Sequence, residues 1–207
     1  MFTRRWLLKT GFFVSLLSVY LHPFLVVWAK MKKILPKGFS REILKDMHPE
    51  EVDNRNLEID PIEKFGIMGT SDISIDLNKY RLKVGGKVKR PLSISYDQIL
   101  KYPQITESVL LICPGFFAYN ARWTGIGIEV IIRETQPEKG SQNIEVKGVD
   151  GKTVKIPLSK LNQKRIFLAY RVNGEKLPER HGFPLRLVYE DAYGSEWVKY
   201  VNELFFS

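Results

Sequence analysis

The sequence contains one cysteine, and its surroundings are compatible with either a metal ligand or a core residue. Cys113 follows four apolar residues, 109–112, which predict the end of a buried strand, and it precedes Pro114-Gly115. Proline fixes φ and glycine permits positive φ, so this pair predicts a tight turn directly after the thiol. A thiolate held there could ligate a soft transition metal. Equally, a lone cysteine after an apolar run can be a small core residue.

A second group of polar side chains lies near the C-terminus. His181 and Arg186 both lie in the seven-residue stretch Arg180-His-Gly-Phe-Pro-Leu-Arg186. Lys199 follows a Tyr193-Gly194 pair. These residues offer the positive charge and the several donors that a phosphate requires, with arginine able to bind in a forked manner. The glycine-rich loops that bind nucleotides are absent from the sequence, so a nucleotide is not expected. Cations near Cys113 would also favour its deprotonated form.

Both Cys113 and Asp150 have an alternative interpretation. Cys113 could be a nucleophile, which needs a histidine base, and His48 or His181 would have to supply it. Neither histidine lies in a local protease pattern. Asp150 precedes Gly151 and offers a carboxylate, although Asp-Gly is also the signal of an ordinary type I′ hairpin turn.

Short strands must position most of these residues. Alternating or continuous apolar patterns predict strands at 80–84, 109–113, 143–149, 152–156, 165–172, 185–189 and 196–206. Asn173-Gly174 predicts a turn after the fifth of these strands. No repeat of 20–50 residues is visible. The pattern predicts an α+β, mainly β, domain.

A few short helices and turns are expected between the strands. Ser95-Tyr-Asp-Gln98 has the spacing of a capping box and predicts a helix through Leu100, which Pro103 would stop. Residues 123–133 predict a loop that enters a second helix. Gly85-Gly86 predicts the turn of a hairpin whose second strand begins at Lys87.

The region before the strands divides into two parts. Residues 34–70 are polar, irregular and interrupted by proline, which predicts an extended linker lying on the surface of a domain at 71–207. The linker ends at Phe65-Gly-Ile-Met-Gly-Thr70, where two glycines would let the backbone approach a ligand closely or would form a simple turn. Phe65 and Gly66 are therefore candidate binding residues.

The net charge of +9 is concentrated at the N-terminus. Residues 1–33 carry six basic and no acidic side chains, and the remainder carries 26 basic and 23 acidic side chains. No basic stripe interleaved with aromatics occurs after residue 33, so nucleic acid is not an expected partner. One cysteine allows no intrachain disulfide.

Residues 1–33 predict an export signal or a membrane anchor. Thr3-Arg-Arg-Trp-Leu-Leu-Lys9 followed by an apolar run resembles a twin-arginine leader, read by a translocase that exports folded proteins. Residues 6–29 are also about long enough to span a bilayer as a helix. Val27-Trp28-Ala29 could serve as a cleavage site. The expected location is the periplasm or the outer face of the cytoplasmic membrane.

The order of motifs over residues 71–207 resembles the sulfite-oxidase-type molybdopterin-binding domain. It runs through Cys113, Trp123-x-Gly125, Asp150-Gly151, Leu168-Ala-Tyr170, Asn173-Gly174, Leu177-Pro178, His181-Gly-x-Pro-Leu-Arg186, Gly194 and Lys199. The resemblance implies that family's fold, with molybdenum and molybdopterin as cofactors. It implies that Cys113 is the thiolate ligand of molybdenum beside the pterin dithiolene. It further implies that His181, Arg186 and Lys199 hold the pterin phosphate, with Asp150 at the cofactor's polar edge.

The resemblance also suggests a branch of the family. Sulfite oxidisers carry extra arginines just after the cysteine, whereas this chain has only Arg122, which is thus a candidate catalytic residue. The nine residues between Cys113 and Trp123 are similar to the spacing in the periplasmic methionine-sulfoxide reductase branch. Phe116, Phe117, Tyr119 and Trp123 would form an apolar mouth, or would belong to the core.

These features together imply an exported molybdenum enzyme. It would transfer an oxygen atom to or from a small substrate such as a sulfoxide and exchange electrons with a separate protein, for which a soluble or membrane-bound cytochrome is the expected candidate. Sulfite dehydrogenase-like oxidation is one alternative. A non-enzymatic exported binding module with the same fold is another.

Overall fold

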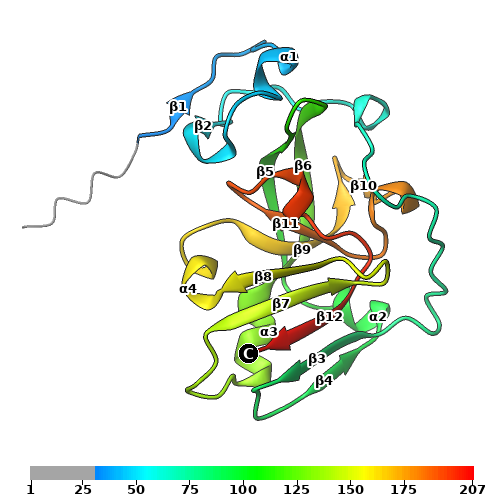
Figure 1. Cartoon of the computed structure of the whole chain (residues 1–207). Coiled ribbons are helices and arrows are strands. Elements are labelled where there is room, and N and C mark those ends of the chain that lie inside the picture. The colour runs from blue at the N-terminus through cyan, green and yellow to red at the C-terminus, as the bar shows by residue number, and fades with distance from the viewer. Residues whose placement is uncertain (1–30) are drawn as a thin grey trace, which may run out of the picture. The chain divides into compact units, whose positions relative to one another are not determined.

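Two five-stranded sheets form the centre of the protein in the computed structural model, which describes residues 31–207 as one unit (Figure 1). The first sheet has the order β10-β9-β6-β5, and β11 also pairs with β9. Its strands are β5 (Gln104–Cys113), β6 (Phe117–Gly127), β9 (Ile166–Val172), β10 (Glu175–Lys176) and β11 (Arg186–Tyr189). All of its pairings are antiparallel.

The second sheet has the order β4-β3-β12-β7-β8 and lies below the first in Figure 1. Its strands are β3 (Leu82–Gly86), β4 (Leu92–Ile94), β7 (Asn143–Gly148), β8 (Thr153–Pro157) and β12 (Val201–Phe206). Only β3 and β12 pair in parallel. The expectation of an α+β, mainly β, fold is therefore confirmed.

The helices are short. They are α1 (Arg41–Leu44), α2 (Tyr96–Ile99), α3 (Ile128–Thr135) and α4 (Leu158–Leu161), with 3-10 helices η1 (Pro49–Glu51), η2 (Ile62–Lys64), η3 (Glu179–His181) and η4 (Gly194–Glu196). From residue 31 onward, no helix has the length and apolar character needed to cross a bilayer. The leader and anchor predicted for residues 1–33 and 6–29 lie almost entirely outside the described residues.

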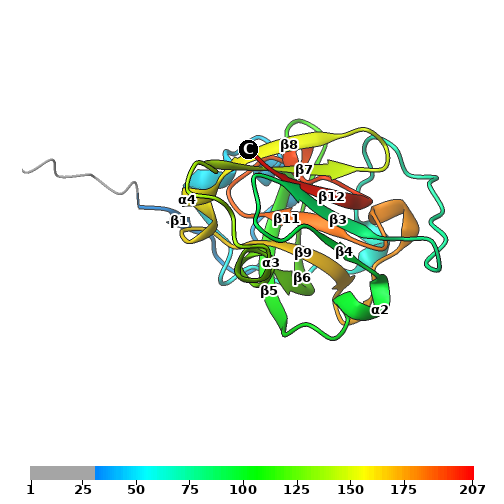
Figure 2. The same ribbon diagram turned by 90° about the horizontal axis from the view of Figure 1, so that it is seen from below.

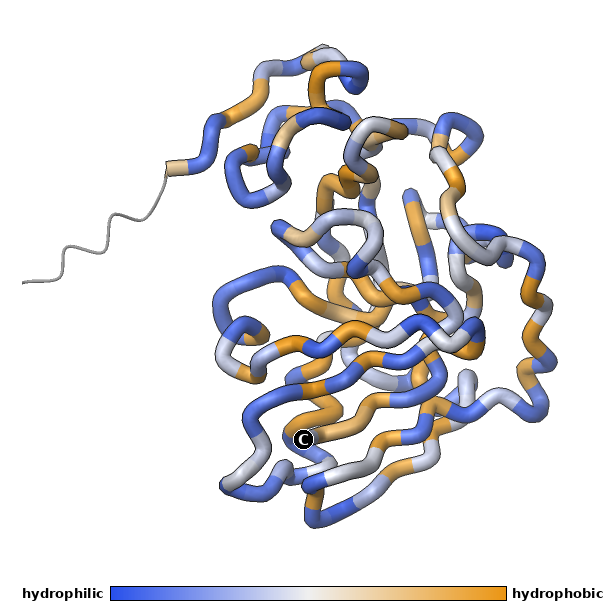
Figure 3. The backbone as a smooth tube through the Cα atoms, viewed as in Figure 1, coloured by the Kyte–Doolittle hydropathy of each residue, from blue (hydrophilic) through white to orange (hydrophobic). Residues whose placement is uncertain are grey.

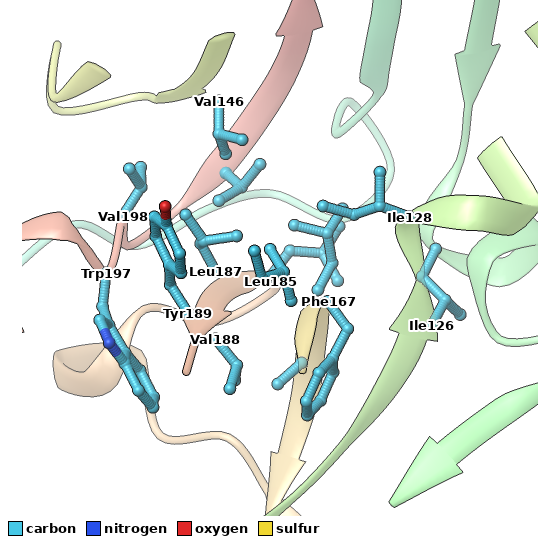
Figure 4. Close-up of a cluster of buried hydrophobic side chains, with 14 of the residues drawn as sticks. Ile126, Ile128, Val146, Phe167, Leu185, Leu187, Val188, Tyr189, Trp197 and Val198 are labelled. Carbon is cyan, nitrogen blue, oxygen red and sulfur yellow. The ribbon is translucent and has the colours of Figure 1, made fainter. Parts of the chain in front are cut away.

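The main core fills the space between the sheets. Strand β7 shows why: Ile144 and Val146 are fully buried while Glu145 and Lys147 point outward, as the period of two in a strand requires. Figure 3 shows the same alternation of hydrophobic and hydrophilic residues along the strands. Figure 4 shows Val146 among side chains from β9, β11 and the 197–198 segment. Each such burial contributes about 1.5–3 kcal/mol to stability.

The segment before residue 65 contains short elements that pack against β5 and β6. Strands β1 (Lys33–Ile34) and β2 (Val52–Asp53) pair in parallel, and this region lies at the end of β5 and β6 in Figure 1. A second apolar cluster joins Leu35, Leu44, Val52 and Leu57 to the outward-facing Leu110, Ile112 and Ala118. The continuous apolar run before Cys113 is thus buried on both faces.

The structure confirms several local predictions. Ser95 and Gln98 form both hydrogen bonds of a capping box, and α2 follows. Asn173 and Gly174 both have positive φ, at 51° and 88°, as the predicted turn requires. Between β7 and β8, only Gly151 has positive φ, so that hairpin does not have the predicted type I′ turn.

Two other predictions about elements were wrong. Residues 123–127 are not a loop but the end of β6, because they pair with both β5 and β9. Gly125 permits this pairing, since a Cβ there would lie 1.9 Å from the Leu168 carbonyl oxygen. The predicted hairpin does form, between β3 and β4, but its second strand begins at Leu92. Gly85 and Gly86 belong to β3 rather than to the turn, and Gly86, at φ 87°, lies directly against the backbone of Phe206 in β12.

Candidate functional site

A cavity of about 240 Å³ opens where β5, the start of β6, the β7–β8 turn and the 181–199 segment meet. Its lining residues are Gly66, Ile67, Met68, Gly69, Thr70, Leu111, Cys113, Phe117, Tyr119, Asp150, Lys152, His181, Arg186, Gly194, Ser195, Trp197 and Lys199. The structure therefore brings most of the predicted site residues together, although they come from positions more than 130 residues apart.

Cys113 is the last residue of β5 and lies at this cavity with 5% of its surface exposed. The predicted turn follows it: Gly115 has a φ of 75°, and the Phe116 amide donates to the Cys113 carbonyl at 3.0 Å. Burial raises the pKa of the Cys113 thiol, and the charges of Arg186 and Lys199 oppose this rise only in part. The expectation that nearby cations favour the thiolate is thus correct in sign, but burial outweighs it.

Arg186 begins β11 and is 4% exposed. Its guanidinium lies 5.6 Å from the ring centroid of Trp123 and 5.7 Å from that of Trp197, and these cation–π contacts favour its position. One guanidinium nitrogen, Nη1, donates to the His181 carbonyl at 2.8 Å. Its Nε is buried and has no partner.

Lys199 and His181 lie beside Arg186 and supply a second cation and a neutral imidazole. The Lys199 ammonium donates to the carbonyls of Thr70, at 2.7 Å, and Arg180, at 3.3 Å. Burial, reinforced by Arg186, lowers the pKa of Lys199 to about 8. Burial and then Arg186 lower the pKa of His181 to about 4, so this imidazole is neutral at pH 7. Its Nε2 atom, like Nε of Arg186, is buried without a partner.

This arrangement fits a buried anion. Arg186 and Lys199 lie at a cavity whose one acidic lining residue is Asp150. Buried cations without enough negative charge nearby are costly, as the lowered pKa of Lys199 reflects. Two buried nitrogen atoms lacking partners add unused hydrogen-bonding capacity. A phosphate with several acceptor oxygens would satisfy both needs, so these residues fit the anionic end of molybdopterin.

The end of the predicted linker forms one wall of the cavity. The Phe65 ring stacks on that of Tyr119 with centroids 4.0 Å apart and lies edge-on to His181 at 5.6 Å. Phe65 is buried and stands behind the wall, whereas Gly66 lines the cavity. A Cβ at Gly66 would lie 2.1 Å from the Phe117 ring, so glycine is required for this close packing.

Arg122 is the predicted site residue that the structure places away from both the cavity and its wall. Its side chain is exposed on β6, and it is not among the cavity-lining residues. Its backbone instead exchanges hydrogen bonds with Asn173, whose amide donates at 2.7 Å and whose side-chain oxygen accepts at 3.0 Å. The structure therefore gives Arg122 a place near the 173–174 turn.

Some cavity residues were not predicted to have a role. Gly194 lies so near the sulfur that a Cβ there would be 2.6 Å from Cys113 Sγ. Trp197 lines the cavity and contacts Arg186, and Thr70 accepts from Lys199. Gly194 is one of the residues of the family's motif order, but nothing in the sequence shows that its backbone lies beside Cys113.

Comparison with known proteins identifies the family. Residues 68–207 match the model of the oxidoreductase molybdopterin binding domain. The NADPH nitrate reductase of Emericella nidulans is 28% identical over 156 residues, covering 62% of this chain and 18% of that protein. The uncharacterized oxidoreductase YuiH of Bacillus subtilis is 26% identical over 141 residues, covering 65% of this chain and 71% of that protein.

A solved structure supports the same fold. The sulfane dehydrogenase SoxCD from Paracoccus pantotrophus superposes with a TM-score of 0.61 and 24% identity, covering 65% of this chain and 39% of that chain. The chain spans less than a fifth of the length of the nitrate reductases that it matches. The family match covers the whole cavity apart from the 66–67 wall and favours an enzyme over a non-enzymatic binding module. The chain belongs to the family of oxidoreductase molybdopterin-binding domains, and the cavity described above lies almost entirely within the matched residues.

Proposed function

We propose that this protein is an exported molybdenum enzyme that reduces a small, weakly charged substrate such as a sulfoxide. The distribution of side chains in the cavity carries this proposal. Ile67 and Met68, which are 40% and 42% exposed, and the half-buried Phe117 form an apolar rim, whereas Arg186 and Lys199 are buried. The buried cations would be occupied by the cofactor phosphate. The substrate would then meet mainly apolar surface on its way to Cys113.

The residues of this chain would hold the cofactor at both of its ends. Arg186, Lys199 and His181 would bind the phosphate, Asp150 would contact the polar edge, and the thiolate of Cys113 would ligate the metal. Phe65 and Gly66 would support the wall beside the cofactor. When bound, molybdenum supplies the two-electron redox change that oxygen-atom transfer requires.

The proposed reaction balances as one sulfoxide, two electrons and two protons giving one thioether and one water. The electrons would come from a separate redox protein, for which we propose a soluble or membrane-bound cytochrome. The nine-residue interval between Cys113 and Trp123 supports the methionine-sulfoxide reductase branch over the sulfite-oxidising branch. With Arg122 away from the cavity, no arginine that follows the cysteine closely in sequence lines it.

We further propose export by the twin-arginine translocase to the periplasm or to the outer face of the cytoplasmic membrane, with residues 6–29 either cleaved or kept as an anchor. Arg4 and Arg5 within the N-terminal pattern support this proposal. Fractionation of cells that express the full chain tests it. Replacing both arginines by lysine should keep the protein in the cytoplasm, and unchanged export would refute the assignment.

Sulfite oxidation is the second candidate. Lys152, an exposed cation at the cavity, favours an anionic substrate, and its backbone amide donates to Asp150 at 3.1 Å. The two candidates differ in substrate charge and in the direction of electron flow. An assay of the loaded enzyme with sulfoxides and a reduced artificial carrier, and with sulfite and an oxidised carrier, separates them.

A substitution in the apolar rim tests whether a neutral substrate enters along it. Met68→Arg places a cation beside the apolar path and should lower kcat/KM for a neutral sulfoxide by about tenfold or more. Leu100→Arg is the matched control, because Leu100 is similarly exposed, at 43%, but does not line the cavity. Turnover of sulfite without turnover of any sulfoxide by the unaltered enzyme would refute the proposed function.

A further inference from the structure

The backbone of one turn confines the Cys113 sulfur. Gly194 begins η4, and a Cβ at this position would lie 2.6 Å from Cys113 Sγ and 3.0 Å from a methyl group of Leu111. Gly194 does not have positive φ, so its backbone conformation is open to any residue. Glycine is therefore required here for space alone, since the turn passes directly beside the thiol.

The turn is internally well bonded and keeps its shape. The Glu196 amide donates to the Tyr193 carbonyl at 2.8 Å, and the Glu196 carboxylate accepts from the Tyr193 amide at 3.3 Å. The Trp197 amide donates to the Gly194 carbonyl at 3.2 Å. A shift at residue 191 would consequently move this turn as a unit, and Gly194 with it.

Asp191 fastens the beginning of this turn. Its side chain is only 5% exposed, and its backbone has a φ of 67°. One carboxylate oxygen accepts from the Lys32 ammonium at 2.5 Å, and the other accepts from the Lys164 ammonium. Lys32 lies 159 residues and Lys164 lies 27 residues before Asp191 in the sequence, so Asp191 joins three separate segments at one point. None of these three residues lines the cavity around Cys113.

Contacts of Glu190 and Tyr193, which flank Asp191 in the sequence, also hold this segment against its neighbours. Glu190 pairs with Arg165 at 2.6 Å and accepts from the Arg165 amide at 2.8 Å. The Tyr193 ring also contacts the His48 ring, with the two centroids 4.9 Å apart. The 190–193 segment is thus held by residues that do not line the cavity around Cys113.

We propose that Asp191 is a positioning residue for Cys113. Its ion pairs with Lys32 and Lys164 hold the 192–197 turn in place, so that the Gly194 backbone keeps the thiol directed into the cavity. This inference rests on the proposed function only in treating that thiol as the metal ligand. The effect of Asp191 on the position of the thiol does not require the cofactor, so it can be measured in the cofactor-free protein.

Alkylation of the cofactor-free protein by iodoacetamide tests the proposal, because Cys113 is the only thiol in the chain. Asp191→Asn keeps the side-chain shape and the tolerance for positive φ but removes the charge. If the ion pairs hold the turn, local opening becomes more frequent, and the alkylation rate should rise about fivefold. Glu203→Gln is the control, since it removes an ion pair to Lys147, at 3.0 Å, that lies away from the cavity.

Low concentrations of urea separate positioning from general stability. A rate increase caused by local opening should not change with urea below the unfolding transition. An unchanged rate in Asp191→Asn, or an increase that grows with urea as global unfolding does, would overturn the proposal. Failure of the unaltered enzyme to reduce sulfoxides would refute the proposed function and leave this result intact.

Gly194→Ala supplies a second, independent test. The added methyl group must displace the turn or the sulfur, so the purified protein should keep its pterin but lose at least about half of its molybdenum. Gly140→Ala is the matched control, because a Cβ there meets no atom within 4 Å and its φ is not positive. An unchanged ratio of metal to pterin in Gly194→Ala would contradict the role of the turn.

Discussion

Replacing Arg186 by methionine should empty the site without unfolding the protein. The side chain is buried, yet it makes one hydrogen bond, to the His181 carbonyl, and its Nε has no partner. Methionine fills much of the same volume and keeps contact with the rings of Trp123 and Trp197. The change therefore removes a charge whose main partner would be the cofactor phosphate.

The expected magnitudes differ sharply between the cofactor-free and loaded forms. In the cofactor-free protein, two cation–π contacts of about 0.5–1 kcal/mol each are lost. The hydrogen bond to the buried His181 carbonyl, worth about 1–3 kcal/mol, is lost as well. Removing a poorly compensated buried charge offsets part of these losses, so the free energy of unfolding should fall by about 1–3 kcal/mol. In the loaded form, two charge-assisted hydrogen bonds of about 1.5–3 kcal/mol each are lost. The cofactor should then bind about 10²–10⁴ times more weakly.

Pterin content per purified chain and the unfolding of the cofactor-free proteins measure these two quantities. Arg122→Met is the matched control, because Arg122 is exposed and lies outside the cavity. We expect Arg122→Met to retain both pterin and turnover. Full pterin loading of Arg186→Met would refute the phosphate assignment, and loss of turnover in Arg122→Met would restore the catalytic role first expected for that residue.

Three further changes test other parts of the site and fold. Cys113→Ser should abolish turnover while pterin remains bound, and normal activity would exclude the thiol as metal ligand. Phe65→Ala removes a buried ring stacked on Tyr119 and should lower the free energy of unfolding by about 3–5 kcal/mol in urea titrations; a loss below about 1 kcal/mol would show that the stack contributes little. Burial alone would raise the pKa of Glu190, but its hydrogen bonds with Arg165 outweigh this and lower the pKa to about 2 from an ordinary 4.5. A lowered carboxyl pKa stabilises the fold above pH 4.5, and this contribution, up to about 3 kcal/mol, should be lost as the pH falls toward 2. Glu190→Gln should flatten the stability profile in that range, and an unchanged profile would contradict the pairing.

The features that could be predicted from the sequence are those fixed by local pattern. The alternation in 143–148, the Asn173-Gly174 turn and the Ser95 cap depend on neighbouring residues and have the expected form. The grouping of Cys113 with the C-terminal cations came from motif order rather than from geometry, and the shared cavity agrees with it.

The features that could not be predicted depend on which distant segments meet. Residues 123–127 form a strand only because β9 lies beside them, with Gly125 against Leu168. Arg122 faces away from the site because successive strand residues point to opposite sides and Trp123 points inward. A salt bridge also joins Asp191, three residues before Gly194, to Lys32, which is 159 residues away in the sequence. No local pattern encodes such a contact.

The most direct test of the assignment of Cys113 is X-ray absorption at the molybdenum edge of the loaded protein, compared with Cys113→Ser. We expect the unaltered protein to show one more sulfur neighbour around molybdenum than the variant shows. The same number of sulfur neighbours in both proteins would mean that the metal is held without Cys113, and the site described here would not be the metal centre.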